Sequence, residues 1–532
     1  MVKDSVEPQI STYVEAIFEE ANMGYSVITE QWIPVTYKTG EKKDVSLNEL
    51  FKEAHLIYSI SDEYEMTNLG IIRLLCVIYM DAYRPETKKD REMELIKESF
   101  DMDTFDSYVK QCEKIGNCFD LFDEKVPFLQ TGDISMQSES CPVSRISNFE
   151  PSGTEITFYN GQNENSYCFS PKDCAKRLCQ KMTTVIKMQG QGFLTFNPLL
   201  NAIFMLNKGN NLKETIVLNS LSKNEWLSTE TIFKYGTESG MLGPSWRQGE
   251  KKYIKKERIY PELSLLSMMT FMSENIKLIQ EDDGYIRRTF YTGKKYKDDK
   301  EEKKNKKEKS EDPLTKYYDP MVMHEEGPKE MKLVSNLDPS IGLWSMIDAL
   351  YTKVGKKIIR PYVLPSNSNE IITVETWSPC KNGKGKGIVY HDEFNINTNI
   401  LDGISVEEVA NSSESFVSII QGFKTTGIKH AFLVLNKGDK KHKNISEIQK
   451  LFRLYMNMTY FPVYIKNLNE MKDESPIEIA LYRKAYKKDV LDAFENIAIK
   501  YLTRFPNDFR YLKAKQKCIK EIKNYFNKIR NK

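Results

Sequence analysis

The feature that most constrains the fold is a change in hydrophobic spacing near residue 404. Before it, alternating segments, turns and short amphipathic stretches follow one another. After it, hydrophobic residues recur every three or four positions, as Ile519, Ile522 and Phe526 show, which is typical of helices with one buried face. A chain of 532 residues is also too long for a single core. We therefore expect an α+β protein, with a mixed domain over residues 1–403 and a helical bundle over residues 404–532.

Local signals place two elements near the start of the mixed domain. Residues 25–35 predict a strand that is ended by Pro34. Ser46, with Glu49 three residues later, has the spacing of a capping box and predicts that a helix begins directly after Ser46. The expected order is therefore strand, hairpin and helix.

Residues 182–220 combine several signals in a short stretch. A helix is expected to end there, followed by a loop with Gly190, Gln191 and Gly192, a short hydrophobic strand, a turn, and a helix that begins at Leu212. The two glycines can take positive φ and leave backbone N–H groups uncovered, so a phosphate or base edge can approach closely. The alternative is an ordinary connection from a helix to a strand.

A β-hairpin is expected later in the mixed domain. Two hydrophobic runs, residues 371–374 and 388–390, flank a glycine- and lysine-rich segment that contains an Asn-Gly pair. Asn382, Lys384 and Lys386 carry the polar side chains near the turn. Alternating glycine and lysine give a thin backbone with positive charge, which suits a nucleic-acid groove. The alternative is a solvent-exposed turn that is lysine-rich like the rest of the chain.

Positive charge is concentrated in two places. From Arg483 to Lys532, fifteen Lys and Arg stand against five Asp and Glu, whereas the whole chain has a net charge of +2, so the preceding residues sum to −8. Residues 294–309 carry nine lysines and five acidic residues. We expect both regions to contact DNA; a solvated helical face and a solubilising loop are the respective alternatives. The candidate residues are Lys294, Lys295, Lys297, Lys484, Lys487, Lys488, Lys513, Lys517 and Lys520.

Several short motifs resemble those of one protein family, and they occur in the same order. They are Trp32-Ile33-Pro34-Val35, Pro127-Phe128 with Gln130-Thr131, Leu242-Gly243-Pro244-Ser245-Trp246, and Asp312-Pro313 with Thr315 and Tyr317. The family is the large subunit (CasA) of the type I-E Cascade complex, the RNA-guided surveillance complex of bacterial CRISPR systems. The resemblance extends from Val27 to the C-terminus.

The resemblance implies a subunit without catalytic activity that recognises the PAM, the short DNA signal beside the target. The loop at Gly190 to Gly192 would lie against the PAM, the hairpin would help to open the duplex, and the basic bundle would hold the displaced strand. Implied partners are the other Cascade subunits, the 5′ handle of the guide RNA, double-stranded target DNA and the helicase-nuclease. CasA proteins typically place a wedging glutamine at the hairpin turn, where this chain has Gly385 or Lys386.

Other locations and other chemistry have less support. Residues 69–80 are hydrophobic on all sides but contain Arg73 and are too short to span a bilayer, so they predict a buried helix. The nine cysteines without a zinc spacing and the lack of a secretory signal favour the cytoplasm and no metal or other cofactor. The alternative function is a metal-dependent nucleic-acid hydrolase that uses His391 and Asp392, a pair expected at the end of a strand.

Overall fold

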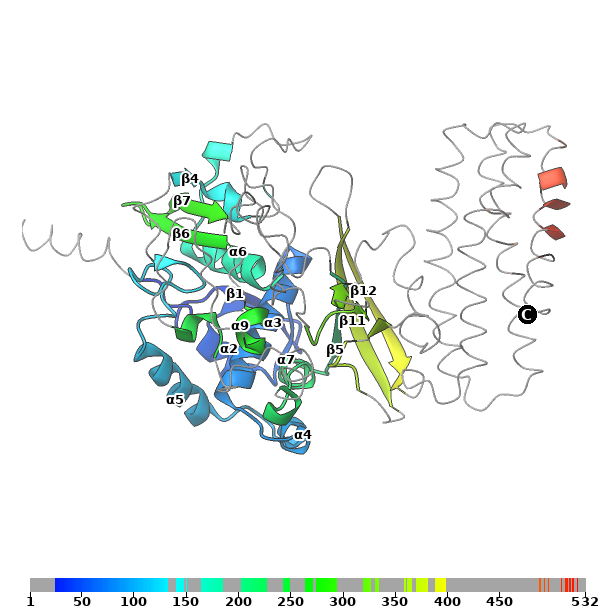
Figure 1. The fold of residues 1–532 in the computed structure, drawn as a ribbon, viewed down its shortest axis with the longest axis horizontal. Coiled ribbons are helices and arrows are strands. Elements are labelled where there is room, and N and C mark those ends of the chain that lie inside the picture. Colours follow the sequence, from blue (N-terminus) through cyan, green and yellow to red (C-terminus); the bar gives the residue numbers. More distant parts are fainter. Residues whose placement is uncertain are drawn as a thin grey trace, which may run out of the picture.

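The computed structural model describes most of the chain before residue 399. The described residues are 24–132, 140–147, 150, 164–184, 202–226, 243–248, 264–270, 274–293, 319–326, 331–333, 358–359, 361–365, 370–380, 388–398 and twelve residues between Lys488 and Asn524. Helices and small antiparallel sheets occur together in this part, which confirms the α+β class (Figure 1). The bundle predicted over residues 404–532, and the boundary before it, lie largely outside the described residues.

The first sheet has the strand order β2-β1-β3. Its elements are β1 (Ile33–Tyr37), β2 (Lys42–Val45) and β3 (Ile57–Ile60), with α2 (Leu47–Glu53) between β2 and β3. The capping box of Ser46 and Glu49 is confirmed. The prediction of a strand over residues 25–35 is wrong, because β1 begins at Ile33 and Pro34 lies inside it. Pairing of β1 with β3 starts only at Val35, so the N–H that proline lacks is not needed there.

A long buried helix, α3 (Glu65–Ala82), lies at the centre of the described body (Figure 1). Every residue from Met66 to Asp81 is buried, which confirms the predicted buried helix. At Gly70, α6 (Pro171–Thr183) packs so closely that a Cβ atom would lie 2.8 Å from Cα of Gln180. The other helices around it are α4 (Lys88–Ile96), α5 (Met102–Glu113), α7 (Leu212–Leu218) and α9 (Leu265–Met269).

Two further small sheets have the orders β4-β7-β6 and β10-β8-β9. Their strands are β4 (Ser140–Pro142), β6 (Glu274–Gln280), β7 (Ile286–Gly293), β8 (His324–Glu326), β9 (Met331–Leu333) and β10 (Ile358–Ile359). The hydrophobic core runs from the first sheet through α3 and α6 to Phe204 and Trp377. No helix in the described ranges is long and hydrophobic enough to cross a membrane.

Candidate nucleic-acid interface

The predicted hairpin is confirmed and is longer than the two hydrophobic runs. Strands β11 (Ile371–Cys380) and β12 (Ile388–Asn397) pair antiparallel along their full length, from Ile371 opposite Asn397 to Cys380 opposite Ile388. Residues 381–387 join the two strands at this end. The candidate side chains of Asn382, Lys384 and Lys386 belong to this connection and lie outside the described residues.

The strand, turn and helix predicted within residues 182–220 are also confirmed. They are β5 (Phe204–Lys208) and α7, which begins at Leu212. Asn211 caps α7, since its side chain accepts a hydrogen bond from the N–H of Glu214. Gly209 is required in the turn, because a Cβ atom there would lie 2.4 Å from Cβ of Glu214. Gly190, Gln191 and Gly192 lie outside the described residues.

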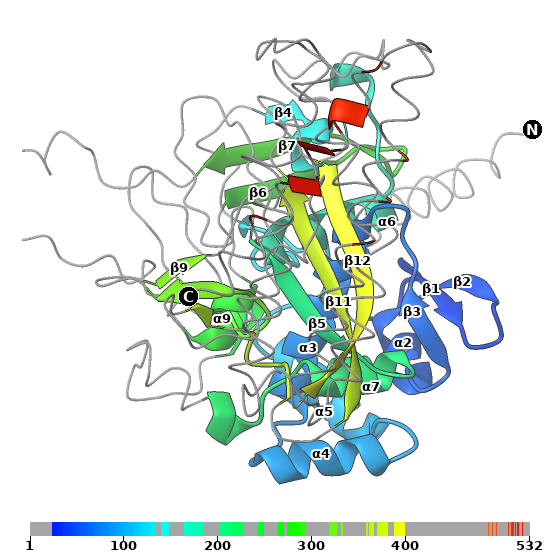
Figure 2. The ribbon, with the colours of Figure 1, turned by 90° about the vertical axis from the view of Figure 1, so that its right-hand side faces the viewer.

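Strand β5 joins the hairpin in one sheet with the order β12-β11-β5 (Figure 2). The pairing of β5 with β11 is antiparallel and places Phe204 opposite Trp377. The start of β5 therefore lies near the end of β11. Trp377 is three residues before Cys380, the last residue of β11, and this separation is about 10 Å along the strand. Residues 185–201, which contain the predicted PAM loop at Gly190 to Gly192, and residues 381–387 of the hairpin are thus attached to the same end of one sheet.

A cluster of charged side chains joins this sheet to the first turn of α3. The Nζ atom of Lys208 lies 3.2 Å from the Glu375 carboxylate and 2.5 Å from that of Glu393. The two ring nitrogens of His391 lie 3.3 Å from Glu65 and 3.6 Å from Glu375. Its ring also stacks on Trp377, with centroids 4.8 Å apart. Three of these pairs link strands within the sheet, and the pair of His391 with Glu65 joins the sheet to α3, beside the hydrophobic packing of Trp377.

The charges in this cluster change one another's pKa. Burial alone would lower the pKa of His391, but the neighbouring Glu375 and Glu65 carboxylates outweigh it and raise that pKa. Burial alone would raise the pKa of Glu375, but His391 and Lys208 outweigh it and lower that pKa. No local sequence pattern predicts this cluster, because its members come from distant segments that are brought together only in the folded protein.

The geometry does not support a metal site at His391 and Asp392. His391 lies inside β12, not at the end of a strand as expected. Consecutive residues of a strand point to opposite faces, and Asp392 accepts a hydrogen bond of 2.7 Å from the hydroxyl of Tyr390 on the other face. The two side chains therefore do not converge. Among the described residues, no three His, Cys, Asp or Glu side chains lie close enough to hold a metal ion.

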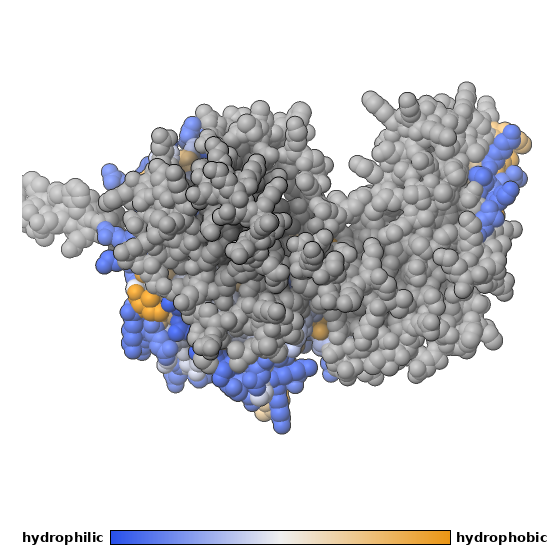
Figure 3. Space-filling model, viewed as in Figure 1, coloured by the Kyte–Doolittle hydropathy of each residue, from blue (hydrophilic) through white to orange (hydrophobic). Residues whose placement is uncertain are grey.

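The predicted basic surfaces are described only near the C-terminus. Lys488, Lys513 and Lys520 are helical and exposed, and Lys517 is helical and half-buried. The spacing of residues 513, 517 and 520 places them on one helix face. The described residues from Lys488 to Asn524 form the red segments of Figure 1, and Figure 3 shows a blue, hydrophilic area beside a smaller hydrophobic one there. The remaining candidates, Lys294, Lys295, Lys297, Lys484 and Lys487, lie outside the described residues.

An exposed aromatic ring lies within this basic surface. Phe509 is 69% exposed, and the Nζ atom of Lys513 lies 5.6 Å from the centroid of its ring. Exposed aromatic rings beside cations are the groups on which unpaired bases stack. The described part of this surface therefore has both components of a site for single-stranded nucleic acid.

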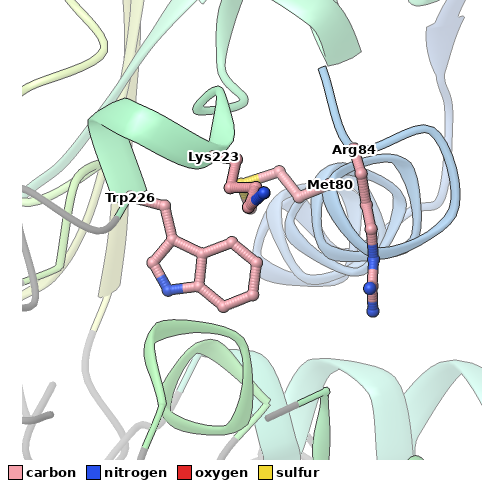
Figure 4. A pocket seen from close by; sticks show the side chains of 4 residues that line it. All are labelled: Met80, Arg84, Lys223 and Trp226. Atoms are coloured by element: carbon pink, nitrogen blue, oxygen red, sulfur yellow. The ribbon is translucent and has the colours of Figure 1, made fainter. Parts of the chain in front are cut away.

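Two cavities in the described residues are less suited to a nucleic acid. The larger, of about 890 Å³, lies between α4, α7 and the start of β11, and its lining has more carboxylates than cations. Its three cations, Lys88, Arg91 and Lys208, are each paired with a carboxylate, so it does not attract a phosphate. The smaller lies among Met80, Arg84, Lys223 and Trp226 (Figure 4), and about 10 Å³ leaves room for at most one water molecule.

Solved structures with the same fold come from CRISPR systems. CasA (Cse1) of Thermus thermophilus is 17% identical with a TM-score of 0.68, and the match covers 95% of this chain and 98% of that one. Cse1 of Acidimicrobium ferrooxidans is 16% identical with a TM-score of 0.66, over 96% and 99%. A chain of a CRISPR RNA-guided surveillance complex is 13% identical with a TM-score of 0.67, over 94% and 99%.

The chain thus has the fold of a CRISPR-associated protein. A family model described as CRISPR-associated protein Cse1 matches residues 27–455, and the chain belongs to this family. No match is found among curated proteins. The name CasA (Cse1) of the Thermus thermophilus structure shows that this is the family whose motifs the sequence resembles.

Proposed function

We propose that the chain is the non-catalytic large subunit of a type I-E CRISPR RNA-guided surveillance complex in the cytoplasm. In it, the protein recognises the PAM in double-stranded DNA, helps to open the duplex and recruits the helicase-nuclease. Its other partners are the remaining Cascade subunits and the 5′ handle of the guide RNA. Membership of the Cse1 family and the fold shared with a chain of a surveillance complex support this proposal.

The DNA-binding part of the proposal rests on one observation, which is that two segments of the chain are attached to the same end of one sheet. Residues 185–201 lead into β5, residues 381–387 leave β11, and β5 and β11 are paired at that end. One segment offers glycines for close backbone approach and the other offers Asn382, Lys384 and Lys386. Groups at one end of a single sheet can contact the same stretch of duplex, which is the arrangement that recognition followed by opening requires.

The base of the hairpin supports a mechanical role. Both strands are ten residues long, β5 adds a third strand beside β11, and Trp377 is 1% exposed. A three-stranded sheet fixed by buried packing holds its shape better than an isolated hairpin. Opening one base step costs a few kcal/mol, and a turn on a rigid base can supply this through contacts with the separated strands.

The experiment replaces Lys384 and Lys386 with alanine in the assembled complex. We expect about tenfold weaker binding to an intact target duplex, since each lost phosphate contact removes part of the energy that opens the first base pair. Binding to a duplex that is already unpaired beside the PAM should change little. Affinities for both duplexes are measured by titration at one salt concentration.

The matched control is Lys110→Ala with Lys114→Ala, which removes two exposed lysines at the C-terminal end of α5. This variant should bind both duplexes as the unaltered complex does. Equal losses on both duplexes, or no loss on either, would show that the hairpin turn does not assist opening.

A further inference from the structure

One buried guanidinium, that of Arg73, contacts both ends of the chain segment that leads into β5. Arg73 lies in the middle of α3 and is 0% exposed. Its Nε atom donates a hydrogen bond of 2.8 Å to the carbonyl of Thr183, the last residue of α6. Its guanidinium carbon lies 5.1 Å from the ring centroid of Phe204, the first residue of β5. Segment 185–201 lies between these two contacts in the sequence.

The second contact is reinforced by Asp319. The Nη1 and Nη2 atoms of Arg73 donate to the two carboxylate oxygens of Asp319 at 3.0 and 2.6 Å, and both side chains are fully buried. Asp319 also accepts the N–H of Met321, whose carbonyl accepts the N–H of Met205 in β5. The ion pair is therefore linked by hydrogen bonds to the start of β5.

These contacts need the guanidinium in particular. Its planar fork presents donors in fixed directions, so one group can serve a carboxylate, a carbonyl and a ring face together. A lysine ammonium at this position has no fork and cannot make the bidentate pair. A charged residue within an otherwise hydrophobic run is also costly to bury without full pairing, and here a backbone carbonyl and a carboxylate both pair with it.

We propose that Arg73, paired with Asp319, is a positioning residue that fixes the separation of Thr184 from Ala202. It thereby holds in place the two residues to which residues 185–201 are joined, and Ala202 is only two residues before the start of β5. The fixed separation follows from the contacts of Arg73 alone, whereas its consequence for DNA binding rests on the proposed function. The two parts therefore have separate tests.

The test compares Arg73→Met with the double variant Arg73→Met/Asp319→Asn. The single variant leaves a buried carboxylate unpaired and should lower Tm strongly. The double variant has no buried charge at this site, and its asparagine can still accept the N–H of Met321, so most of Tm should return. It still lacks the hydrogen bond to Thr183 and the contact with Phe204, so positioning should remain lost.

Positioning is measured by hydrogen exchange in the full-length protein. In the double variant, the amides of Thr184 and Met205 should exchange about tenfold faster, while the amide of Tyr83 at the end of α3 should not change. The matched control is Arg91→Met/Glu225→Gln, which removes another largely buried ion pair away from this segment. It should leave exchange at Thr184 and Met205 unchanged.

In the assembled complex, the double variant should bind target DNA about tenfold more weakly although its Tm is largely restored. Exchange and DNA affinity that both return with Tm would show that Arg73 is only structural and overturn the proposal. Faster exchange with unchanged, PAM-dependent DNA binding would overturn its functional part. Binding by the unaltered complex that does not depend on the PAM would refute the proposed function, while the exchange result would still decide whether Arg73 fixes the two ends.

Discussion

His324 is a buried histidine whose surroundings lower its pKa. It is 0% exposed, and one of its ring nitrogens lies 3.1 Å from the backbone nitrogen of Asp319. Burial lowers its pKa from 6.5 to about 4, although the Asp319 carboxylate acts in the opposite direction. The folded protein therefore keeps this ring neutral at a pH where the unfolded chain begins to bind a proton.

This difference predicts a loss of stability in mild acid. Because the folded pKa is the lower one, the contribution of His324 is present above pH 6.5 and is lost as the pH falls toward 4. Between pH 7 and pH 5.5 the loss amounts to about 1 kcal/mol in the free energy of unfolding. We expect urea unfolding to show this decrease in the unaltered protein, and His324→Gln to remove about that much of the pH dependence.

His391 provides a control with the opposite sign. Its pKa is raised in the folded protein, so its contribution is present below pH 6.5 and is lost as the pH rises through the folded pKa. His391→Gln should therefore make the decrease between pH 7 and pH 5.5 steeper. A His324→Gln variant with the same pH dependence as the unaltered protein would contradict the assignment of a buried, neutral His324.

At the scale of secondary-structure elements, the close crossing of α3 and α6 depends on Gly70. An added Cβ would lie 2.8 Å from Cα of Gln180 and 3.0 Å from the hydroxyl of Thr183. Within an isolated helix, alanine is more favourable than glycine by about 1 kcal/mol. The contact with the backbone of α6 should outweigh this preference, since a neighbouring backbone cannot move aside as the end of a side chain can.

We therefore predict that Gly70→Ala lowers the free energy of unfolding by about 1 to 3 kcal/mol. Hydrogen exchange should also become faster at the end of α6, as the two helices are pushed apart. Gly284→Ala is the control: its φ of +79° gives backbone strain, but no atom lies within 4 Å of the added Cβ. It should destabilise the protein without changing exchange in α6. A Gly70→Ala variant as stable as the unaltered protein would show that the two helices can separate without loss.

The elements that could be predicted from sequence are those set by adjacent residues. The capping box at Ser46 and the start of α7 at Leu212 depend on neighbours within a few positions, and both are confirmed. The start of β1 could not be predicted, because strand pairing rather than local propensity decides where it begins. The place of β5 beside β11 depends on contacts such as that of Phe204 with Trp377, which have no local signal.

At the scale of the whole molecule, distant segments are joined by buried polar contacts. Arg73 and Asp319 are 246 residues apart, and Lys208 reaches Glu375 across 167 residues. An arginine within a hydrophobic run indicates a buried partner, but the sequence could not say which carboxylate it is. The candidate site could likewise be predicted as segments, through glycine and lysine patterns, whereas their attachment to one sheet became visible only in the fold.

The distribution of charge over the molecule leads to a prediction about salt. The C-terminal region carries an excess of ten positive charges while the rest sums to −8, and Lys488, Lys513 and Lys520 are exposed on helices. Lysines that contact phosphates release counterions, so each lost contact with single-stranded DNA should reduce the slope of log K against log salt by about 0.7. Replacing all three with alanine should therefore reduce that slope by about 2 for the assembled complex.

The measurement is a titration of target DNA at several salt concentrations. Removal of the exposed lysines Lys89, Lys110 and Lys114 from α4 and α5 changes the total charge equally and should leave the slope unaltered. Phe509→Ala should weaken binding at every salt concentration without changing the slope, because stacking of a base on its ring releases no counterion. An unchanged slope in the Lys488, Lys513 and Lys520 variant would mean that this face does not bind the displaced strand. If these lysines contact DNA directly, only the variant of Lys488, Lys513 and Lys520 should have a smaller slope. Equal changes of slope in both lysine variants would instead mean that only the net charge of the protein matters.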